Sequence, residues 1–175
     1  MSWGTGGGAR AARARRGALA LGAGLLSVTA LGCSGVSTQR SPAPAARPGG
    51  PEAAPVAEVV SLTNARRAEA GCGPATPQPQ LTRAAQLHAD DMAENDYFSH
   101  TSRDGRAPWD RAREQGYTGR SIGENIARGY PTARAVMDGW MGSGGHRANI
   151  ENCSWRHIGV GYDAGTRTWV QMFGR

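Results

Sequence analysis

Apolar side chains recur every three or four positions in three stretches of the chain, and this period predicts three helices; a further short helix, closed by Gly116, is predicted between the second and the last of them. The first is expected to end at Gly71, because glycine readily adopts the left-handed conformation that closes a helix. The fourth begins at Pro131 or Thr132, and its regular apolar face is expected in the core. Three glycines are expected to end it and to leave His146 on a backbone with little steric restraint. The four predicted helices cover residues 56–71, 82–94, 108–115 and 131–141.

The C-terminal part of the chain has the pattern of a β-hairpin. Two largely apolar stretches, residues 155–162 and 168–173, flank the turn-forming sequence Asp163-Ala164-Gly165. A third, short extended segment is expected over residues 124–127. Helices mixed with antiparallel strands in about 120 residues predict a layered α+β domain that is large enough to fold by itself.

Residues 1–33 have the features of a secretory signal peptide. An arginine-rich start precedes residues 17–32, which carry no charge and are too few for an ordinary membrane span. An uncleaved anchor helix is the alternative. The sequence Ala30-Leu31-Gly32-Cys33 resembles a bacterial lipobox, although Ala30 stands where leucine is usual. We therefore predict that Cys33 is lipidated and that the protein is secreted or held at the outer face of the cell membrane.

Residues 34–55 are rich in proline, alanine and serine and are expected to form a disordered linker, since they contain too few apolar side chains for a core. The globular domain is expected over residues 56–175. All 20 basic side chains are arginine; six of them precede residue 50, and 14 acidic side chains balance the other 14. A nucleic-acid-binding domain needs an excess of positive charge, so we exclude that class of partner.

The chain has three cysteines. With Cys33 assigned to lipid, Cys72 and Cys153 remain, and an exported protein favours a disulfide between them. A zinc site is disfavoured for this pair because no CxxC spacing is present.

Four motifs carry a resemblance to a known family. They lie in the last two-thirds of the chain and resemble, in order and spacing, the bacterial branch of the CAP (SCP-like) superfamily. The resemblance implies a three-layer α-β-α sandwich of CAP type. It also implies a pocket lined by two histidines and two acidic residues, in which the histidines can hold a divalent metal ion. The motifs are Tyr97-Phe98-Ser99-His100, Gly123-Glu124-Asn125-Ile126-Ala127, the segment from Trp140 to Ile150, and Trp169-Val170-Gln171-Met172-Phe173-Gly174.

Matched to the family position by position, His100 and His146 correspond to the two histidines and Glu124 to one acid. Ser143 stands in place of the second acid, and a serine cannot balance the charge of a metal ion or act as a general base. Gln171 is expected to face the same cleft from the last strand. Two neutral imidazoles suit Zn²⁺ with water completing the shell. We therefore expect weak binding, which falls as the pH drops through about 6.5.

The role of Glu124 is open at this point. Four alternative roles fit the sequence: a third metal ligand, a partner that fixes the tautomer of a histidine, a base acting on metal-bound water, or a structural partner of His100 alone. A triad of Ser143, His146 and Glu124 is disfavoured because no nucleophile elbow or oxyanion-hole sequence accompanies it, and Ser143 is expected to end the helix. His88 lies on the apolar face of its helix and is expected to be a hydrogen-bonded core residue.

The function that we expect is that of an extracytoplasmic binding module. Its cleft would take a small apolar or lipid-like ligand or an envelope protein, with a divalent metal such as zinc taking part. The alternative is a metal-assisted hydrolase or peptidase of the cell envelope with Glu124 as its base, and a passive envelope protein is a third hypothesis. The loss of the second acid at Ser143 favours binding over hydrolysis.

Overall fold

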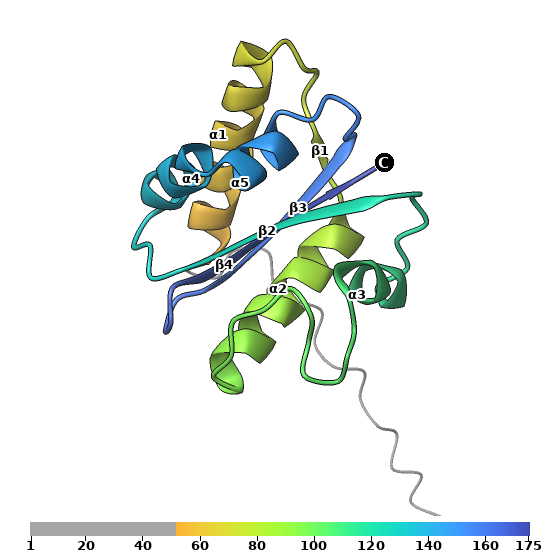
Figure 1. The fold of residues 1–175 in the computed structure, drawn as a ribbon, viewed down its shortest axis with the longest axis vertical. Coiled ribbons are helices and arrows are strands. Elements are labelled where there is room, and N and C mark those ends of the chain that lie inside the picture. The colour runs from red at the N-terminus through yellow and green to blue at the C-terminus, as the bar shows by residue number, and fades with distance from the viewer. Residues whose placement is uncertain (1–51) are drawn as a thin grey trace, which may run out of the picture. The chain divides into compact units, whose positions relative to one another are not determined.

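The computed structural model describes residues 52–175 (Figure 1). The predicted signal peptide, its Cys33 and most of the predicted linker lie outside the described residues. Within residues 52–175, no helix is both long enough and apolar enough to cross a membrane. The elements, in chain order, are α1 (Ala53–Glu69), β1 (Thr76–Pro77), α2 (Pro79–Glu94), α3 (Pro108–Glu114), β2 (Ile122–Arg128), α4 (Ala133–Gly142), α5 (Gly144–Ile150), β3 (His157–Asp163) and β4 (Thr168–Gly174).

The four predicted helices are all present, and local sequence signals explain their ends. α1 begins at Ala53, so the last residues of the predicted linker are helical. α2 begins at Pro79, three residues before its predicted start, because a proline in the first turn has no N–H to leave unpaired. Thr132 caps α4, since its Oγ1 accepts a hydrogen bond from the backbone N–H of Ala135 over 3.2 Å. Gly71 follows α1 with a φ of 77°, as expected.

The four strands form one sheet in the order β1-β3-β4-β2. β3 and β4 are the predicted hairpin, β2 pairs antiparallel with the other side of β4, and β1 pairs parallel with β3. β1 was not predicted, because a strand of two residues has no period to recognise. β2 includes the predicted extended segment and lies at one edge of the sheet.

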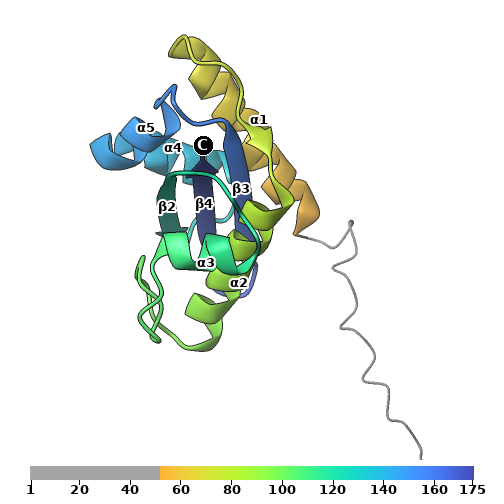
Figure 2. The same cartoon turned by 90° about the vertical axis from the view of Figure 1, so that its right-hand side faces the viewer.

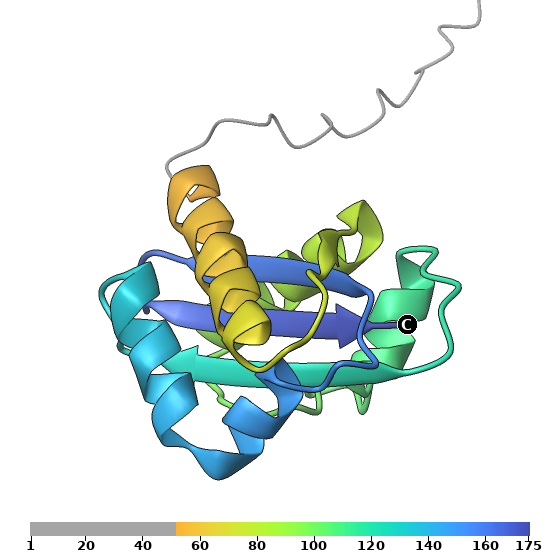
Figure 3. The same ribbon diagram turned by 90° about the horizontal axis from the view of Figure 1, so that it is seen from above.

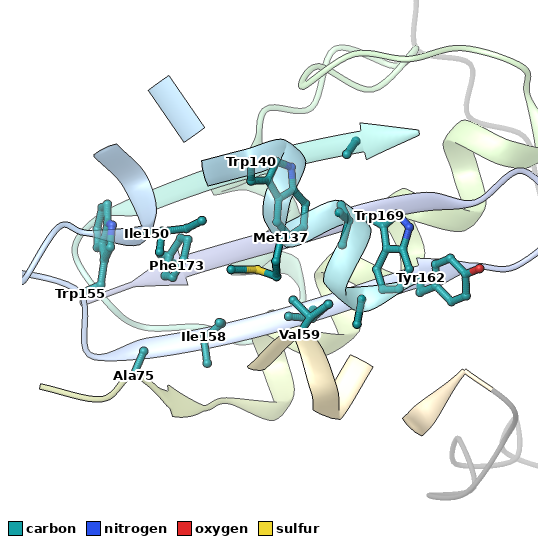
Figure 4. Packing of buried hydrophobic residues seen from close by; sticks show 14 residues of the cluster. Val59, Ala75, Met137, Trp140, Ile150, Trp155, Ile158, Tyr162, Trp169 and Phe173 are labelled. Atoms are coloured by element: carbon teal, nitrogen blue, oxygen red, sulfur yellow. The ribbon is translucent and has the colours of Figure 1, made fainter. Parts of the chain in front are cut away.

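Helices cover both faces of the sheet, which gives three layers (Figures 2 and 3). α1, α4 and α5 lie on one face, and α2 and α3 lie on the other (Figure 1). Trp169 and Phe173 of the central strand β4 belong to the core under α1 and α4, which Figure 4 shows, whereas Val170 and Met172 belong to the core under α2. The predicted three-layer α-β-α sandwich is therefore confirmed.

Helix α5 was not predicted. The glycines after the fourth predicted helix were interpreted as a flexible segment, but Gly142 ends α4, Gly144 begins α5, and only Ser143 lies between them. None of these glycines has a positive φ. Of the seven residues of α5, Ile150 alone is buried, so the sequence has no apolar stripe from which this helix could be recognised. His146 therefore lies on a helix and not on a loop.

Helix α2 packs directly on the backbone of β3 at Gly159 and Gly161. A Cβ atom at either position would overlap the α2 backbone, at Leu81 for Gly159 and at Ala85 for Gly161. We predict that Gly161→Ala lowers the free energy of unfolding by about 1–3 kcal/mol, because a closely packed core must shift to admit the methyl group. Gly165→Ala, in the β3–β4 turn, is the matched control, since its Cβ would make only ordinary contacts. Equal losses for the two variants in urea denaturation would contradict this packing.

Cys72 and Cys153 form the predicted disulfide, with Cα atoms 4.8 Å apart and a sequence separation of 81 residues. The bond joins the segment after α1 to the segment after α5. The fully buried guanidinium of Arg67 ties the same two segments together. It donates hydrogen bonds to the carbonyl of Gly73 on one side and to the carbonyls of Ile150, Asn152 and Trp155 on the other.

Candidate binding site

The structure brings His100 and Glu124 into direct contact. His100 lies in the loop between α2 and α3, and its Nδ1 is 2.8 Å from Oε1 of Glu124 in β2. The other carboxylate oxygen, Oε2, accepts a hydrogen bond from Nη2 of Arg111 over 2.6 Å. The side chain of Glu124 is 2% exposed and that of Arg111 is 4% exposed, whereas that of His100 is 52% exposed. A buried ion pair thus underlies an exposed imidazole.

Arg111 also holds the loop that carries His100. Its Nη1 donates to the backbone carbonyls of His100 and Arg106, over 2.9 and 3.0 Å, and to Oγ of Ser102 over 3.2 Å. One guanidinium therefore fixes both the loop and the carboxylate partner of the imidazole. The sequence analysis missed this residue. The signal that could have found it is an arginine beside the buried Ala112, on the face of α3 that packs against the domain.

The contact with Glu124 sets the tautomer of His100. A carboxylate only accepts hydrogen bonds, so Nδ1 of His100 carries a proton, and in the neutral ring Nε2 keeps its lone pair for another partner. Of the roles left open for Glu124, this geometry matches the partner that fixes a tautomer. Each oxygen of Glu124 already accepts a hydrogen bond, and its side chain is 2% exposed, so the buried carboxylate is poorly placed to serve as a base or a metal ligand.

Strand β2 connects residues from both faces of the sheet. Successive side chains of a strand point to opposite faces, so Glu124 lies on the α3 side and Asn125 on the α5 side. The side-chain amide of Asn125 donates to the carbonyl of His146 over 3.1 Å. The side-chain amide of Asn149 donates to the carbonyl of Glu124 over 3.1 Å and to Oδ1 of Asn125 over 2.9 Å. These bonds fasten the helix that carries His146 to the strand that carries Glu124.

His146 is half-buried and lies near His100 at this edge of the sheet. Burial lowers the pKa of His146, and a positive charge on His100, in its protonated form, lowers it further. His146 therefore stays neutral to a lower pH than a free imidazole does. The neutral ring is the form that can bind a metal ion.

The other two predicted pocket residues are Ser143 and Gln171, and they differ in their surroundings. Ser143 ends α4 and precedes α5, as expected, and its side chain makes no capping hydrogen bond to α5. Gln171 was expected to face the cleft, and that expectation is wrong, because its side chain is fully buried in the centre of the sheet. Its amide donates to Oγ1 of Thr63 over 2.7 Å and accepts from Asn125 over 2.9 Å.

The donors at this site suit a weakly held metal ion. Residues 52–175 contain no group of three or more histidine, cysteine, aspartate or glutamate side chains placed to hold one. Catalytic zinc usually has three protein ligands. With Glu124 engaged, the remaining donors are Nε2 of His100 and the ring of His146. They fit a divalent ion whose other positions are filled by water or by a ligand.

His88 is confirmed as a hydrogen-bonded core residue. Its side chain is 1% exposed, and its Nε2 lies 2.9 Å from the carbonyl oxygen of Ser99. Burial lowers the pKa of His88, and the charge of Arg111 lowers it further. Near pH 6.5 the unfolded chain therefore takes up a proton at this residue while the folded protein does not. Stability is full above that pH and falls below it.

We predict that His88→Gln makes the loss of stability at acidic pH smaller. One such group lowers the free energy of unfolding by at most about 1.4 kcal/mol per pH unit, until it takes up a proton in the folded state as well. Urea denaturation between about pH 5 and pH 8 measures the slope. A residual slope is expected because the lowered pKa of His146 acts in the same direction. An unchanged slope in His88→Gln would contradict the assignment.

Comparison with protein families and curated proteins gives a consistent result. The sequence model of the CAP family, described as the cysteine-rich secretory protein family, matches residues 60–173. The Bacillus subtilis protein YkwD is 40% identical over 116 residues, which cover 66% of this chain and 45% of YkwD. The membrane protein YlbC of the same species is 36% identical over 106 residues, which cover 61% of this chain and 31% of YlbC. The chain thus spans less than half the length of these relatives.

Solved structures have the same fold. An extracellular protein of Bacillus anthracis that contains an SCP domain is similar with a TM-score of 0.68 at 32% identity, over 71% of this chain and 41% of that one. An outer surface protein of Borrelia burgdorferi has a TM-score of 0.65 at 20% identity, over 70% of this chain and 92% of that one, a likeness that shows the fold alone. Since the family model spans most of the described domain, the chain belongs to the CAP family.

Proposed function

We propose that this CAP domain is a binding module that works outside the cytoplasm and holds its ligand at the imidazoles of His100 and His146, with a divalent metal ion such as Zn²⁺ taking part. The observation that carries the proposal is the contact between Nδ1 of His100 and Oε1 of Glu124, whose other oxygen is bonded to Arg111. In the neutral form of this exposed imidazole, the contact orients Nε2 with its lone pair free, the usual preparation of a histidine for a metal ion.

The same contact favours binding over hydrolysis. A general base needs an oxygen within hydrogen-bond reach of the proton that it removes. The side chain of Glu124 is 2% exposed, and its oxygens already accept hydrogen bonds from His100 and Arg111. Ser143 stands in place of the second acid. The site therefore offers two imidazoles beside a buried carboxylate, which suits the holding of a ligand better than the activation of water.

The surface beside His100 favours a ligand with an apolar part. Phe98 is 49% exposed, and the guanidinium carbon of Arg128 lies 5.4 Å from the centroid of its ring. Arg103 lies over the ring of Tyr97 at 5.5 Å in the same way. An exposed aromatic ring such as that of Phe98 binds apolar groups, and the adjacent arginines favour negative charge. A lipid-like molecule or an apolar segment of an envelope protein fits this description.

The proposed location rests on three observations. Residues 1–33 have the pattern of a signal peptide, with Cys33 in the position of a lipidated cysteine. The Bacillus anthracis relative is described as extracellular. A disulfide such as Cys72–Cys153 persists in oxidising compartments. We therefore place the domain at the outer face of the cell membrane, tethered through Cys33.

Isothermal titration calorimetry with Zn²⁺ tests the proposed site. We predict weak binding to the purified protein, lowered at least about tenfold by either His100→Ala or His146→Ala, because each removes one of two imidazole donors. Glu124→Gln is expected to weaken binding about 10–100-fold, the range typical of a partner that orients a metal-bound histidine.

His157→Asn is the matched control. Nδ1 of His157 lies 2.9 Å from the hydroxyl oxygen of Tyr117, on β3 and away from the edge strand β2. Asparagine keeps a polar atom near that position, and Zn²⁺ binding should equal that of the unmodified protein. Unchanged binding in both His100→Ala and His146→Ala would overturn the proposal. So would a hydrolytic activity that is removed both by a chelator and by Glu124→Gln.

A further inference from the structure

A small cavity lies between α2 and α3, beside the loop that carries His100. Its volume is about 20 Å³, and roughly 10–15 Å³ is enough to hold one water molecule. Ala84, His88 and Asp91 line it from α2, and Arg111 and Glu114 line it from α3. The cavity is thus large enough for a single water and is bounded by polar groups.

Two of the residues that line this cavity each carry a buried side-chain nitrogen with no hydrogen-bond partner among residues 52–175. These nitrogens are Nδ1 of His88, a residue that is 1% exposed, and Nε of Arg111, a residue that is 3% exposed. Leaving such an atom unpaired in the interior is costly, so nearly all buried polar atoms have a partner. Both residues line one cavity, so a single bound molecule is the simplest shared partner for the two atoms.

The two nitrogens require different hydrogen-bond partners. Nε2 of His88 faces the carbonyl oxygen of Ser99, which only accepts, so Nε2 carries the proton and Nδ1 has a lone pair. The N–H at Nε of Arg111 can only donate. A metal cation cannot accept the hydrogen bond that Nε–H of Arg111 donates, and an anion would be repelled by the carboxylates of Asp91 and Glu114 in the same lining. A water molecule can donate to the first atom and accept from the second.

We propose that one water molecule is bound in this cavity, where it donates to Nδ1 of His88 and accepts from Nε–H of Arg111. The two side chains that it joins both anchor the loop before α3. His88 holds the carbonyl of Ser99, and Arg111 holds those of His100 and Arg106. The water completes one connected polar unit that positions His100, and this inference does not depend on metal binding.

Rotating-frame Overhauser spectroscopy between water and protein protons tests this site in the full chain. A cross-peak is expected between the water resonance and Hε of Arg111, together with a ¹⁵N shift at Nδ1 of His88 that indicates an unprotonated, hydrogen-bonded nitrogen. Ala84→Val adds two methyl groups to the cavity wall and should abolish the cross-peak. Ala93→Val makes the same change on α2 outside the cavity lining and should leave it.

The cross-peak in the unmodified protein tests the proposal even if Ala84→Val does not fold. Absence of the cross-peak in the unmodified protein would overturn the proposal. A cross-peak that persists in folded Ala84→Val would also overturn it, since the water would then lie elsewhere. Loss of Zn²⁺ binding has no bearing on either outcome, so this test and the test of the proposed function fail separately.

Discussion

Arg111→Leu is expected to lower the free energy of unfolding by about 3–5 kcal/mol, the usual cost of removing one partner of a buried ion pair. The substitution leaves the carboxylate of Glu124 buried without its cation. It also removes the donors to the carbonyls of His100 and Arg106, so the loop before α3 loses its anchor. Urea denaturation of the variant and of the unmodified protein measures the difference.

Two further variants separate the ion pair from a general effect of losing an arginine. Arg106→Ala removes a guanidinium that pairs with Asp104 and Glu114 at the surface, and such pairs contribute about 0–1 kcal/mol. The double variant Arg111→Leu/Glu124→Leu should recover part of the loss, since apolar residues can replace a buried pair at little cost. A loss for Arg111→Leu no larger than that for Arg106→Ala would contradict the role assigned to Arg111.

Cys72→Ala/Cys153→Ala is expected to lower the free energy of unfolding by about 4–5 kcal/mol. The disulfide closes a loop with a sequence separation of 81 residues, and a loop of this length restricts the unfolded chain strongly. The folded state should change little, because Arg67 still holds the segments after α1 and after α5 together. The effect is therefore expected to arise in the unfolded state.

Chemical reduction supplies the matching measurement for the disulfide. The reduced unmodified protein and the double cysteine variant should unfold at the same urea concentration, and reduction should not change the variant. A loss below about 1 kcal/mol in both would show that the chain-entropy estimate does not apply to this domain.

The parts of the fold that the sequence predicted are those with a repeated pattern. The apolar face of α4 repeats over its whole length, and the β3–β4 hairpin has two apolar stretches around a turn. α5 and β1 carry no such pattern, because Ile150 is the one buried residue of α5 and β1 has two residues. Pattern analysis detects elements that bury a face, and these two bury almost none.

The site was predicted only in part, because its contacts join residues that lie on different elements. Residue types and family motifs indicated His100, Glu124 and His146, but no pattern could show that Arg111 pairs with Glu124, since the two residues lie on different elements. Gln171 was misplaced because alternation along β4 does not tell a solvent-facing side from one covered by a helix. The tertiary arrangement of α1, α4 and β4 decides that question.

The tautomer of His100 tests the account most directly. Long-range ¹H–¹⁵N NMR at pH 7.5 distinguishes a ring protonated at Nδ1 from one protonated at Nε2. We predict the Nδ1–H form for His100, held by Glu124, and a shift of its Nε2 signal and of the His146 ring on addition of Zn²⁺, while His88 and His157 do not respond. An Nε2–H tautomer for His100, or a Zn²⁺ response confined to other histidines, would contradict the account.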